Sequence, residues 1–205
     1  MIAARLILAS ASPQRRGLLL RVYPDFEVIP CQLREPDPPP TSELSVQPRR
    51  WALALAYFKA RAVAELHPGR WVLGADTVVD CGGQMLGKAR DAEEARRMLA
   101  LQASRPSEVI TGLCLLRLGP EPRRLQRVDV TRVYMRDDAV AREAYLAGGD
   151  WRDKAGAYGI QTVGDRLVER IEGSFSNVVG LPLRTLAALL VEAGLSPRPV
   201  EDDGP

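Results

Sequence analysis

Histidine and cysteine are scarce in this sequence of 205 residues, which contains one histidine and three cysteines. Cys31, Cys81 and Cys114 are far apart and lack a CxxC spacing, so neither a disulfide framework nor a zinc site is expected, and a reducing compartment fits. His67 lies where a helix is expected to end, which favours a capping or surface role. Chemistry that needs a histidine base or a histidine-rich metal site is therefore disfavoured.

Long apolar runs and a strong net charge are also missing. No run approaches the roughly 18 residues that a membrane helix needs. Residues 1–10 are apolar but contain Arg5 and run into a polar turn, so they are interpreted as a buried strand and not as a signal peptide. A net charge of only +2 argues against nucleic-acid binding. We expect a soluble, cytoplasmic protein without a membrane partner.

Lysine is the third scarce residue. Of the 28 basic residues, 25 are arginine and only three are lysine: Lys59, Lys88 and Lys154. Arginine replaces lysine readily where charge alone matters, so a position that stays lysine is a candidate for a compact ammonium group that a guanidinium cannot imitate. With three positions this is a hint, and it makes their neighbourhoods worth examining.

The hydrophobic pattern predicts alternating strands and helices. Apolar residues Trp51, Leu55, Phe58, Ala62 and Leu66 share one expected helix face. A Gly-Gly pair indicates a hairpin, and two long strands that follow each other indicate a mixed sheet. The strands are expected at 6–9, 26–30, 71–80, 109–118, 125–135 and 167–171. The polar turn from Ser10 to Arg16 opens a helix through Leu20, and further helices are expected to begin near Pro48, Asp91, Asp137 and Pro182.

Three segments are expected to be irregular. Residues 36–48 hold five prolines and predict a mobile loop, and residues 148–164 predict a second loop rich in glycine. A tail is expected over residues 196–205. The length suits one domain over residues 1–195, or two lobes that share a core.

The first chemical motif runs from Ser10 to Arg16, directly after a strand and at the start of a helix. Backbone N–H groups at a helix N-terminus favour an anion, and the hydroxyl and guanidinium groups of this segment add donors for phosphate oxygens. A capped and solvated helix start explains the same residues equally well.

The second motif is Asp76 within the apolar strand at 71–80. A lone buried carboxylate is costly, so it must form an ion pair, bind a metal or line a cleft. Glu35, at the edge of the proline-rich loop, is a candidate second carboxylate, and a solvated surface acid is the alternative interpretation.

The third motif is Gly87-Lys88. With Gly82 it matches most of a P-loop, but Ala89 stands where a P-loop places Ser or Thr, so a P-loop is rejected. Lys88 next to the strand with the carboxylate still suits phosphate binding.

The fourth motif, residues 153–161, contains Lys154, Gln161 and small residues that let a ligand approach the backbone. Lysine binds phosphate, and a glutamine amide both donates and accepts, as reading a base edge requires; a flexible loop is the alternative. Residues 173–182, with the sole asparagine of the chain, are explained by a turn. Two acids and several cations without a nucleophile–histidine pair suit metal-assisted attack of water on a polyphosphate.

These motifs together resemble the Maf proteins, nucleotide pyrophosphatases also called septum formation inhibitors. The matching stretches occur in family order and reach to about Leu195: LILASASPQRRGLLL, VLGADTVVD, MLGKARDAEEARRML, EVITGLCLL, DKAGAYGIQ and GSFSNVVGLPL. The resemblance implies an α/β fold with an elongated mixed β-sheet flanked by helices and a deep central cleft, similar to inosine triphosphate pyrophosphatases. It also implies Mg²⁺ or Mn²⁺ as cofactor, and often a homodimer.

The resemblance implies roles for individual residues. The catalytic acid maps onto Asp76 and its companion onto Glu35, with both holding the metal and Lys88 assisting at the phosphates. The other groups that contact the substrate map onto Ser10, Ser12, Gln14, Arg15, Lys59, Thr77, Lys154 and Gln161.

The implied activity is hydrolysis of the α–β phosphoanhydride bond of a nucleoside triphosphate, a step in the house-cleaning of nucleotide pools. Thr77 and Gln161 resemble the dTTP/UTP branch of the family, whereas Gln14 departs from the arginine often found there. Two alternatives remain open: a pyrophosphatase for 7-methyl-GTP or another modified nucleotide, and a non-catalytic nucleotide-binding regulator of cell division.

Overall fold

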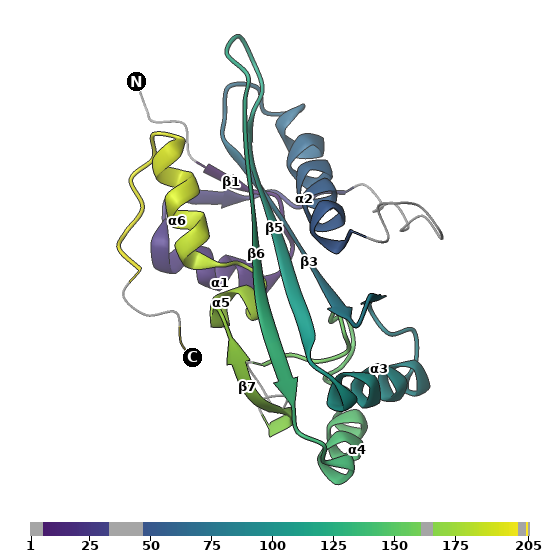
Figure 1. Ribbon diagram of the computed structural model, residues 1–205. Coiled ribbons are helices and arrows are strands. Elements are labelled where there is room, and N and C mark those ends of the chain that lie inside the picture. The colour runs from purple at the N-terminus through teal and green to yellow at the C-terminus, as the bar shows by residue number, and fades with distance from the viewer. Residues whose placement is uncertain (1–5, 33–46, 161–165, 201–203, 205) are drawn as a thin grey trace.

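The computed structural model describes residues 6–32, 47–160, 166–200 and 204. Its centre is a seven-stranded sheet in the order β2-β1-β3-β5-β6-β7, with β4 paired to β3, and helices cover both faces (Figure 1). The strands are β1 Leu6–Leu8, β2 Phe26–Val28, β3 Val72–Cys81, β4 Gln84–Leu86, β5 Ser107–Arg117, β6 Arg123–Met135 and β7 Val168–Glu172. The helices are α1 Pro13–Val22, α2 Pro48–Ala64, α3 Ala92–Ser104, α4 Ala139–Gly148, α5 Phe175–Val179 and α6 Leu183–Glu192.

The sheet is mixed, as the two long consecutive strands predicted. β1 runs parallel to β2 and β3, whereas β5 and β6 form a long antiparallel hairpin that continues the sheet from β3 to β7. The elongated shape follows from these strands, because β5 and β6 span 11 and 13 residues (Figure 1). The expected elongated, mixed α/β fold is confirmed.

Two layers of helices lie on opposite faces of the sheet. Side chains alternate along a strand, so consecutive residues of β3 contact different layers. Leu73 and Ala75 pack in a core with leucines of α1 and α6, whereas Gly74 faces the backbone of α2 at Ala56 and Ala60. The α2 layer and the α1/α5/α6 layer therefore contact alternate residues of β3.

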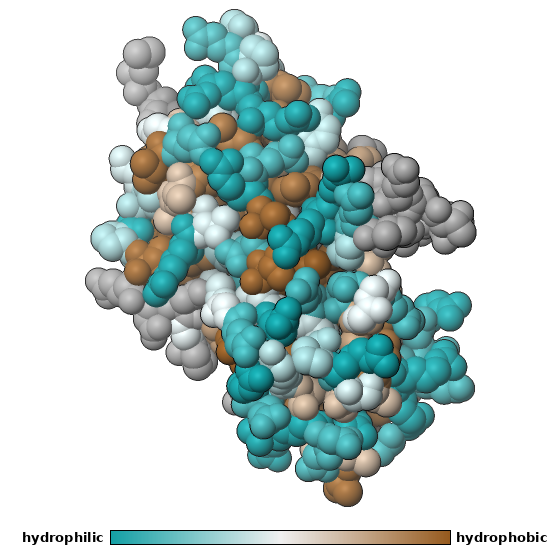
Figure 2. Space-filling view, viewed as in Figure 1, coloured by the Kyte–Doolittle hydropathy of each residue, from teal (hydrophilic) through white to brown (hydrophobic). Residues whose placement is uncertain are grey.

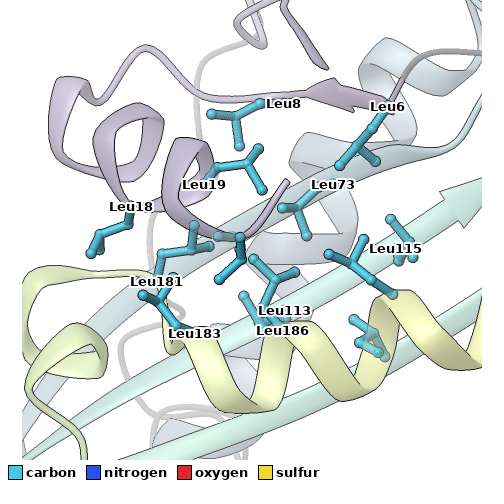
Figure 3. Packing of buried hydrophobic residues seen from close by; sticks show 14 of the residues in the cluster. Leu6, Leu8, Leu18, Leu19, Leu73, Leu113, Leu115, Leu181, Leu183 and Leu186 are labelled. Carbon is cyan, nitrogen blue, oxygen red and sulfur yellow. The ribbon is translucent and has the colours of Figure 1, made fainter. Parts of the chain in front are cut away.

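Apolar side chains gather in separate clusters along the length of the sheet. One cluster is built largely from leucines, which point toward each other between α1, α6 and the sheet (Figure 3). A second cluster joins α3, α4 and the loop before β7 around Leu99, Tyr145 and Trp151. On the face seen in Figure 2, hydrophilic residues dominate and hydrophobic ones emerge in small patches. No helix within the described ranges has the length and apolar character needed to cross a bilayer.

Two glycines let α2 lie directly on the strands. A Cβ atom at Gly74 would be 2.1 Å from the Ala56 carbonyl oxygen, and one at Gly112 would be 2.5 Å from the Ala52 carbonyl. Real side chains do not approach backbone atoms this closely, so only glycine fits at these two positions. The close approach fixes where the inner face of α2, including Lys59, meets β3.

Helix starts follow the local signals in the sequence, with one shift. Ser12 and Asp91 each cap a helix by accepting a hydrogen bond from the backbone N–H three residues later, and Pro48 occupies the first turn of α2. The α4 cap is Asp138 and not Asp137, because the Asp138 side chain accepts from the Ala141 N–H at 2.9 Å.

Two expectations about side chains and loops were wrong. Leu66 is 76% exposed, because α2 ends at Ala64; Trp51 and Leu55 of the expected face are buried, together with Ala52, Ala56, Lys59, Ala60 and Val63. The segment after β7, interpreted as a turn, contains the short helix α5, capped by the Ser174 hydroxyl. Within the expected tail, the Arg198 N–H donates to the Val22 carbonyl at 2.7 Å. The division into a domain over residues 1–195 and a flexible tail stays a prediction.

The buried cysteines are expected to resist alkylation in the native protein. Burial raises the pKa of Cys114 to about 12 and also raises the pKa of Cys81. Because the thiolate is the reactive form, Cys114 should react with iodoacetamide at pH 8 about 10³-fold more slowly than in urea. Mass spectrometry of protein quenched at successive times measures this ratio, with half-buried Cys31 as the internal comparison. Equal rates for Cys114 in native and unfolded protein would contradict the burial.

Candidate active site

The candidate site is built on one edge of β3. Along its other edge, β3 pairs with β5 from Val72 to Asp80. Along the edge that carries the site, β1 pairs with β3 as far as Leu73, and β4 pairs with β3 from Val79 onward. Within the described parts of the chain, no strand pairs with Gly74–Val78 on this side, and we call this stretch the open edge of β3.

Two loops converge on the open edge. β1 is parallel to β3, so the chain from Ser10 onward runs alongside the start of the open edge, after the Ala9 N–H donates to the Leu73 carbonyl at 2.8 Å. β4 is antiparallel, so the chain beyond Leu86 carries Lys88 toward the other end. The first and third sequence motifs therefore flank the second in space.

Asp76 lies in the middle of the open edge and forms a buried ion pair. Lys59 Nζ is 2.6 Å from Asp76 Oδ1, and the two side chains are 11% and 9% exposed. Asp76 faces α2 because it has the same parity along β3 as Gly74. The pair satisfies the requirement that a buried carboxylate be matched by a cation, and it places a negative and a positive group in one site.

The turn after β1 presents hydroxyl groups that are already part of a local network. The Ser12 hydroxyl accepts from the Arg15 N–H at 3.3 Å and donates to Gln14 Oε1 at 3.0 Å, while the Ser12 N–H donates to the Ser10 hydroxyl at 3.2 Å. Ser10 is buried and Gln14 is exposed. The helix cap and an anion-binding N-terminus use the same residues, so the two interpretations are compatible.

Arg15 links α1 to β3 on the face opposite Asp76. Its Nε donates to the Gly180 carbonyl at 2.9 Å, and its Nη2 donates to the Thr77 hydroxyl at 3.1 Å. Asp76 and Thr77 are neighbours in the strand, so their side chains point to the α2 layer and to the α1/α5/α6 layer, respectively. A ligand at the open edge can reach both faces, because no strand covers that edge among the described residues.

The loop with Lys154 is joined to the segment of Lys88. Lys88 and Ala155 form an isolated antiparallel bridge, and the Gly156 N–H donates to the Gly87 carbonyl at 3.0 Å. Lys88 is exposed, whereas Lys154 is half-buried and its ammonium group donates to the Asp150 carbonyl. The third and fourth motifs thus belong to one structural unit, although they are far apart in sequence.

Three polar residues that the sequence did not single out support this arrangement. Gln102 is 1% exposed and donates to the Gly156 carbonyl at 2.8 Å, which ties the Lys154 loop to α3. Thr111 and Asn177 are fully buried, and the Thr111 hydroxyl is 2.9 Å from that of Thr77. The signal that could have identified Asn177 is that it is the only asparagine in the chain, although a turn accounts for the residue type at this position.

Two residues of the expected site, Glu35 and Gln161, lie outside the described residues. Among the residues that are described, no group of three or more His, Cys, Asp or Glu side chains is arranged to hold a metal ion. Among the described residues, the site offers the carboxylate of Asp76 paired with Lys59, while Lys88 and the start of α1 lie on the two loops that flank the open edge. One acid among several cations and backbone N–H groups is suited to a polyphosphate.

The chain is similar to known proteins over most of its length. A family model described as Maf-like protein matches residues 5–193. A dTTP/UTP pyrophosphatase from Nitratidesulfovibrio vulgaris is 46% identical over 92% of this chain and 87% of its own. A dTTP/UTP pyrophosphatase from Deinococcus radiodurans is 42% identical over 95% of both chains. Among solved structures, a HAM1 protein from Coxiella burnetii aligns over 91% of this chain and 98% of its own, with 18% identity and a TM-score of 0.48.

Proposed function

The chain belongs to the Maf-like protein family, and we propose that it hydrolyses dTTP and UTP to the nucleoside monophosphate and pyrophosphate. The structural observation that carries this proposal is the buried Asp76–Lys59 pair at the open edge of β3, between two loops that bring phosphate-binding groups. Relatives that are 38–46% identical over most of the chain and named dTTP/UTP pyrophosphatase support the choice of substrate.

A divalent metal ion fits the proposed chemistry. Asp76 supplies a buried carboxylate in a site that otherwise carries positive charge, and hard cations such as Mg²⁺ are bound by one or two carboxylates together with phosphate oxygens. Asp76 and Glu35 would hold the ion, with Glu35 lying outside the described residues. When bound, such an ion neutralises phosphate charge and makes water a stronger nucleophile at neutral pH.

Asp76 acts on the attacking water in this proposal. Its carboxylate orients the water in line with the α-phosphorus and accepts a proton as the new oxygen–phosphorus bond forms. The bond from the α-phosphorus to the bridging oxygen breaks, and pyrophosphate leaves. Lys59 keeps the carboxylate in place, and Lys88, Lys154 and Arg15 counter the charge that develops on the departing pyrophosphate.

Base recognition is assigned to the other face of β3. Thr77 lies at the open edge next to Asp76 and is held by Arg15 at 3.1 Å. Gln161, which belongs to the same sequence motif as Lys154 and lies outside the described residues, supplies an amide in the proposal. A homodimer and a cytoplasmic location stay predictions from the sequence.

The proposed function is tested by measuring pyrophosphate release from dTTP, UTP, CTP, GTP and 7-methyl-GTP with Mg²⁺. We expect dTTP and UTP to exceed the purine nucleotides in kcat/KM by at least about tenfold, which is the usual discrimination of a pocket shaped for one base. If 7-methyl-GTP leads, the reaction type stands and the assignment of the base pocket is wrong. If no nucleotide is hydrolysed with Mg²⁺ or Mn²⁺, the result favours the alternative of a non-catalytic nucleotide-binding regulator.

A further inference from the structure

Asn177 is held in one orientation inside the molecule. Its side-chain Nδ2 donates to the Val109 carbonyl at 3.0 Å and to the Thr131 hydroxyl at 2.9 Å, and its backbone N–H donates to the Ser174 hydroxyl at 2.9 Å. Since the Val109 carbonyl can only accept, the amide nitrogen must face it. The backbone carbonyl of Asn177, which is fully buried, is therefore an acceptor at a fixed place.

This carbonyl determines how the Thr111 hydroxyl is used. Thr111 Oγ1 is 3.2 Å from the Asn177 carbonyl oxygen and 2.9 Å from Thr77 Oγ1. A hydroxyl has one hydrogen to donate and two lone pairs that accept. The hydrogen of Thr111 goes to the carbonyl, which cannot donate in return. Both contacts are satisfied only when Thr111 accepts the hydrogen of Thr77.

The Thr77 hydroxyl is then limited to accepting. Its hydrogen is used on Thr111, and Arg15 Nη2 donates to one of its lone pairs at 3.1 Å. Among the described contacts, the second lone pair is the part of this hydroxyl that remains for a ligand at the open edge. Uracil and thymine carry an N–H donor at N3, whereas cytosine has an acceptor there.

We propose that Thr111 is a positioning residue for base selection, which makes the Thr77 hydroxyl an acceptor-only group that matches the N3–H of uracil and thymine. The inference rests on the proposed function, in which Thr77 faces the base. It adds that a residue without contact to the substrate determines the discrimination against cytosine. Thr111 acts through the direction of one hydrogen bond and not through its size.

The test compares the affinities of the α,β-methylene analogues of UTP and CTP for the wild-type protein and for Thr111→Val. Wild-type protein should prefer the UTP analogue. Without the Thr111 hydroxyl, the Thr77 hydrogen is released and can be donated to N3 of cytosine, so the preference should fall by at least about tenfold. Calorimetric titration with each analogue gives the ratio. Thr111→Ala carries the same expectation if Thr111→Val does not fold.

Two further variants separate hydrogen-bond direction from general damage. Thr111→Ser keeps the hydroxyl and should keep the wild-type preference. Thr131→Val removes another fully buried hydroxyl bonded to Asn177, but one that does not contact Thr77. Asn177 keeps its bonds to the Val109 carbonyl and the Ser174 hydroxyl in this variant, so the preference should also be kept even if stability falls. A merely structural role of Thr111 predicts that Thr111→Val and Thr131→Val alter both affinities in parallel.

The outcomes distinguish this inference from the proposed function. An unchanged preference in Thr111→Val, an equal change in Thr131→Val, or a wild-type protein that binds the two analogues equally or not at all overturns the inference. Turnover of UTP by wild-type protein is measured separately. If wild-type protein turns over UTP but Thr111→Val keeps the preference for the UTP analogue, the proposed function stands and the inference is wrong. If Thr111→Val loses this preference but wild-type protein does not turn over UTP, the inference stands and the proposed function is wrong.

Discussion

Replacing Asp76 by asparagine is expected to lower kcat for UTP by about 10²- to 10⁴-fold, the range that a positioned base contributes. Asparagine has the size of aspartate but cannot take a proton from water and binds a divalent cation more weakly. The KM for UTP should change much less, because Lys59, Lys88 and Arg15 still attract the triphosphate. Steady-state measurement of pyrophosphate release over a range of UTP and Mg²⁺ concentrations gives both constants.

Asp80→Asn is the matched control for this variant. Asp80 lies four residues further along β3 with the same parity, and its carboxylate accepts from the Gly83 N–H at 3.3 Å in the β3–β4 turn, outside the proposed site. It should retain a kcat close to wild type. Because Asp76→Asn leaves Lys59 without its buried counter-ion, Asp76→Glu is tested as well, which keeps the charge and displaces the carboxylate. Near-normal activity in both Asp76 variants would remove this residue from the catalytic role.

Gly74→Ala is expected to lower the free energy of unfolding by roughly 3 kcal/mol or more, at the upper end of what overpacking costs. The added Cβ would lie 2.1 Å from the Ala56 carbonyl oxygen and 2.8 Å from the Ala60 backbone nitrogen. Both are backbone atoms of α2, so no side-chain rotation can relieve the contact and the helix itself must move. Urea denaturation followed by circular dichroism measures the difference.

Gly17→Ala is the matched control for Gly74→Ala. Gly17 lies inside α1, and a Cβ built there meets no atom within 4 Å. Alanine in a helix interior is favoured over glycine by about 0.5–1 kcal/mol, so this variant should be slightly stabilised. Gly112→Ala, with its clash against the Ala52 carbonyl, should behave like Gly74→Ala. A stability of Gly74→Ala equal to wild type would show that α2 does not lie as closely on β3 as described.

Local signals explain why much of the fold was predictable from the sequence. The Gly82-Gly83 turn, the Asp91 cap and Pro48 act within four residues of their own position, and each marks an element boundary in the structure. The face of α2 was predicted in part: Trp51 and Leu55 are buried as expected, but the alanines of the face were missed. Ala52, Ala56 and Ala60 lie against the sheet, because glycines on the facing strands let the backbones approach closely.

The candidate site was predictable as a set of residues and not as an arrangement. Asp76 stood out because it interrupts an apolar strand, and the lysines stood out because they are rare. Nothing local indicates that Lys59, 17 residues away, is the cation that pairs with it. Asn177 was noticed as the only asparagine but without a role, and Thr111 was not recognised, because the two residues make contact across 66 residues of sequence that only the fold brings together.

The alternation of side chains along β3 has a consequence for how such an enzyme can diversify. Asp76 and Thr77 are covalent neighbours, yet one belongs to the α2 layer and the other to the α1/α5/α6 layer. With the roles proposed for Thr77 and Asp76, a substitution that alters base preference can be accommodated by repacking one layer, while the layer that holds the proposed reacting carboxylate stays as it is. Two residues joined by a single peptide bond can in this way change independently during evolution, one with substrate choice and the other with reaction chemistry.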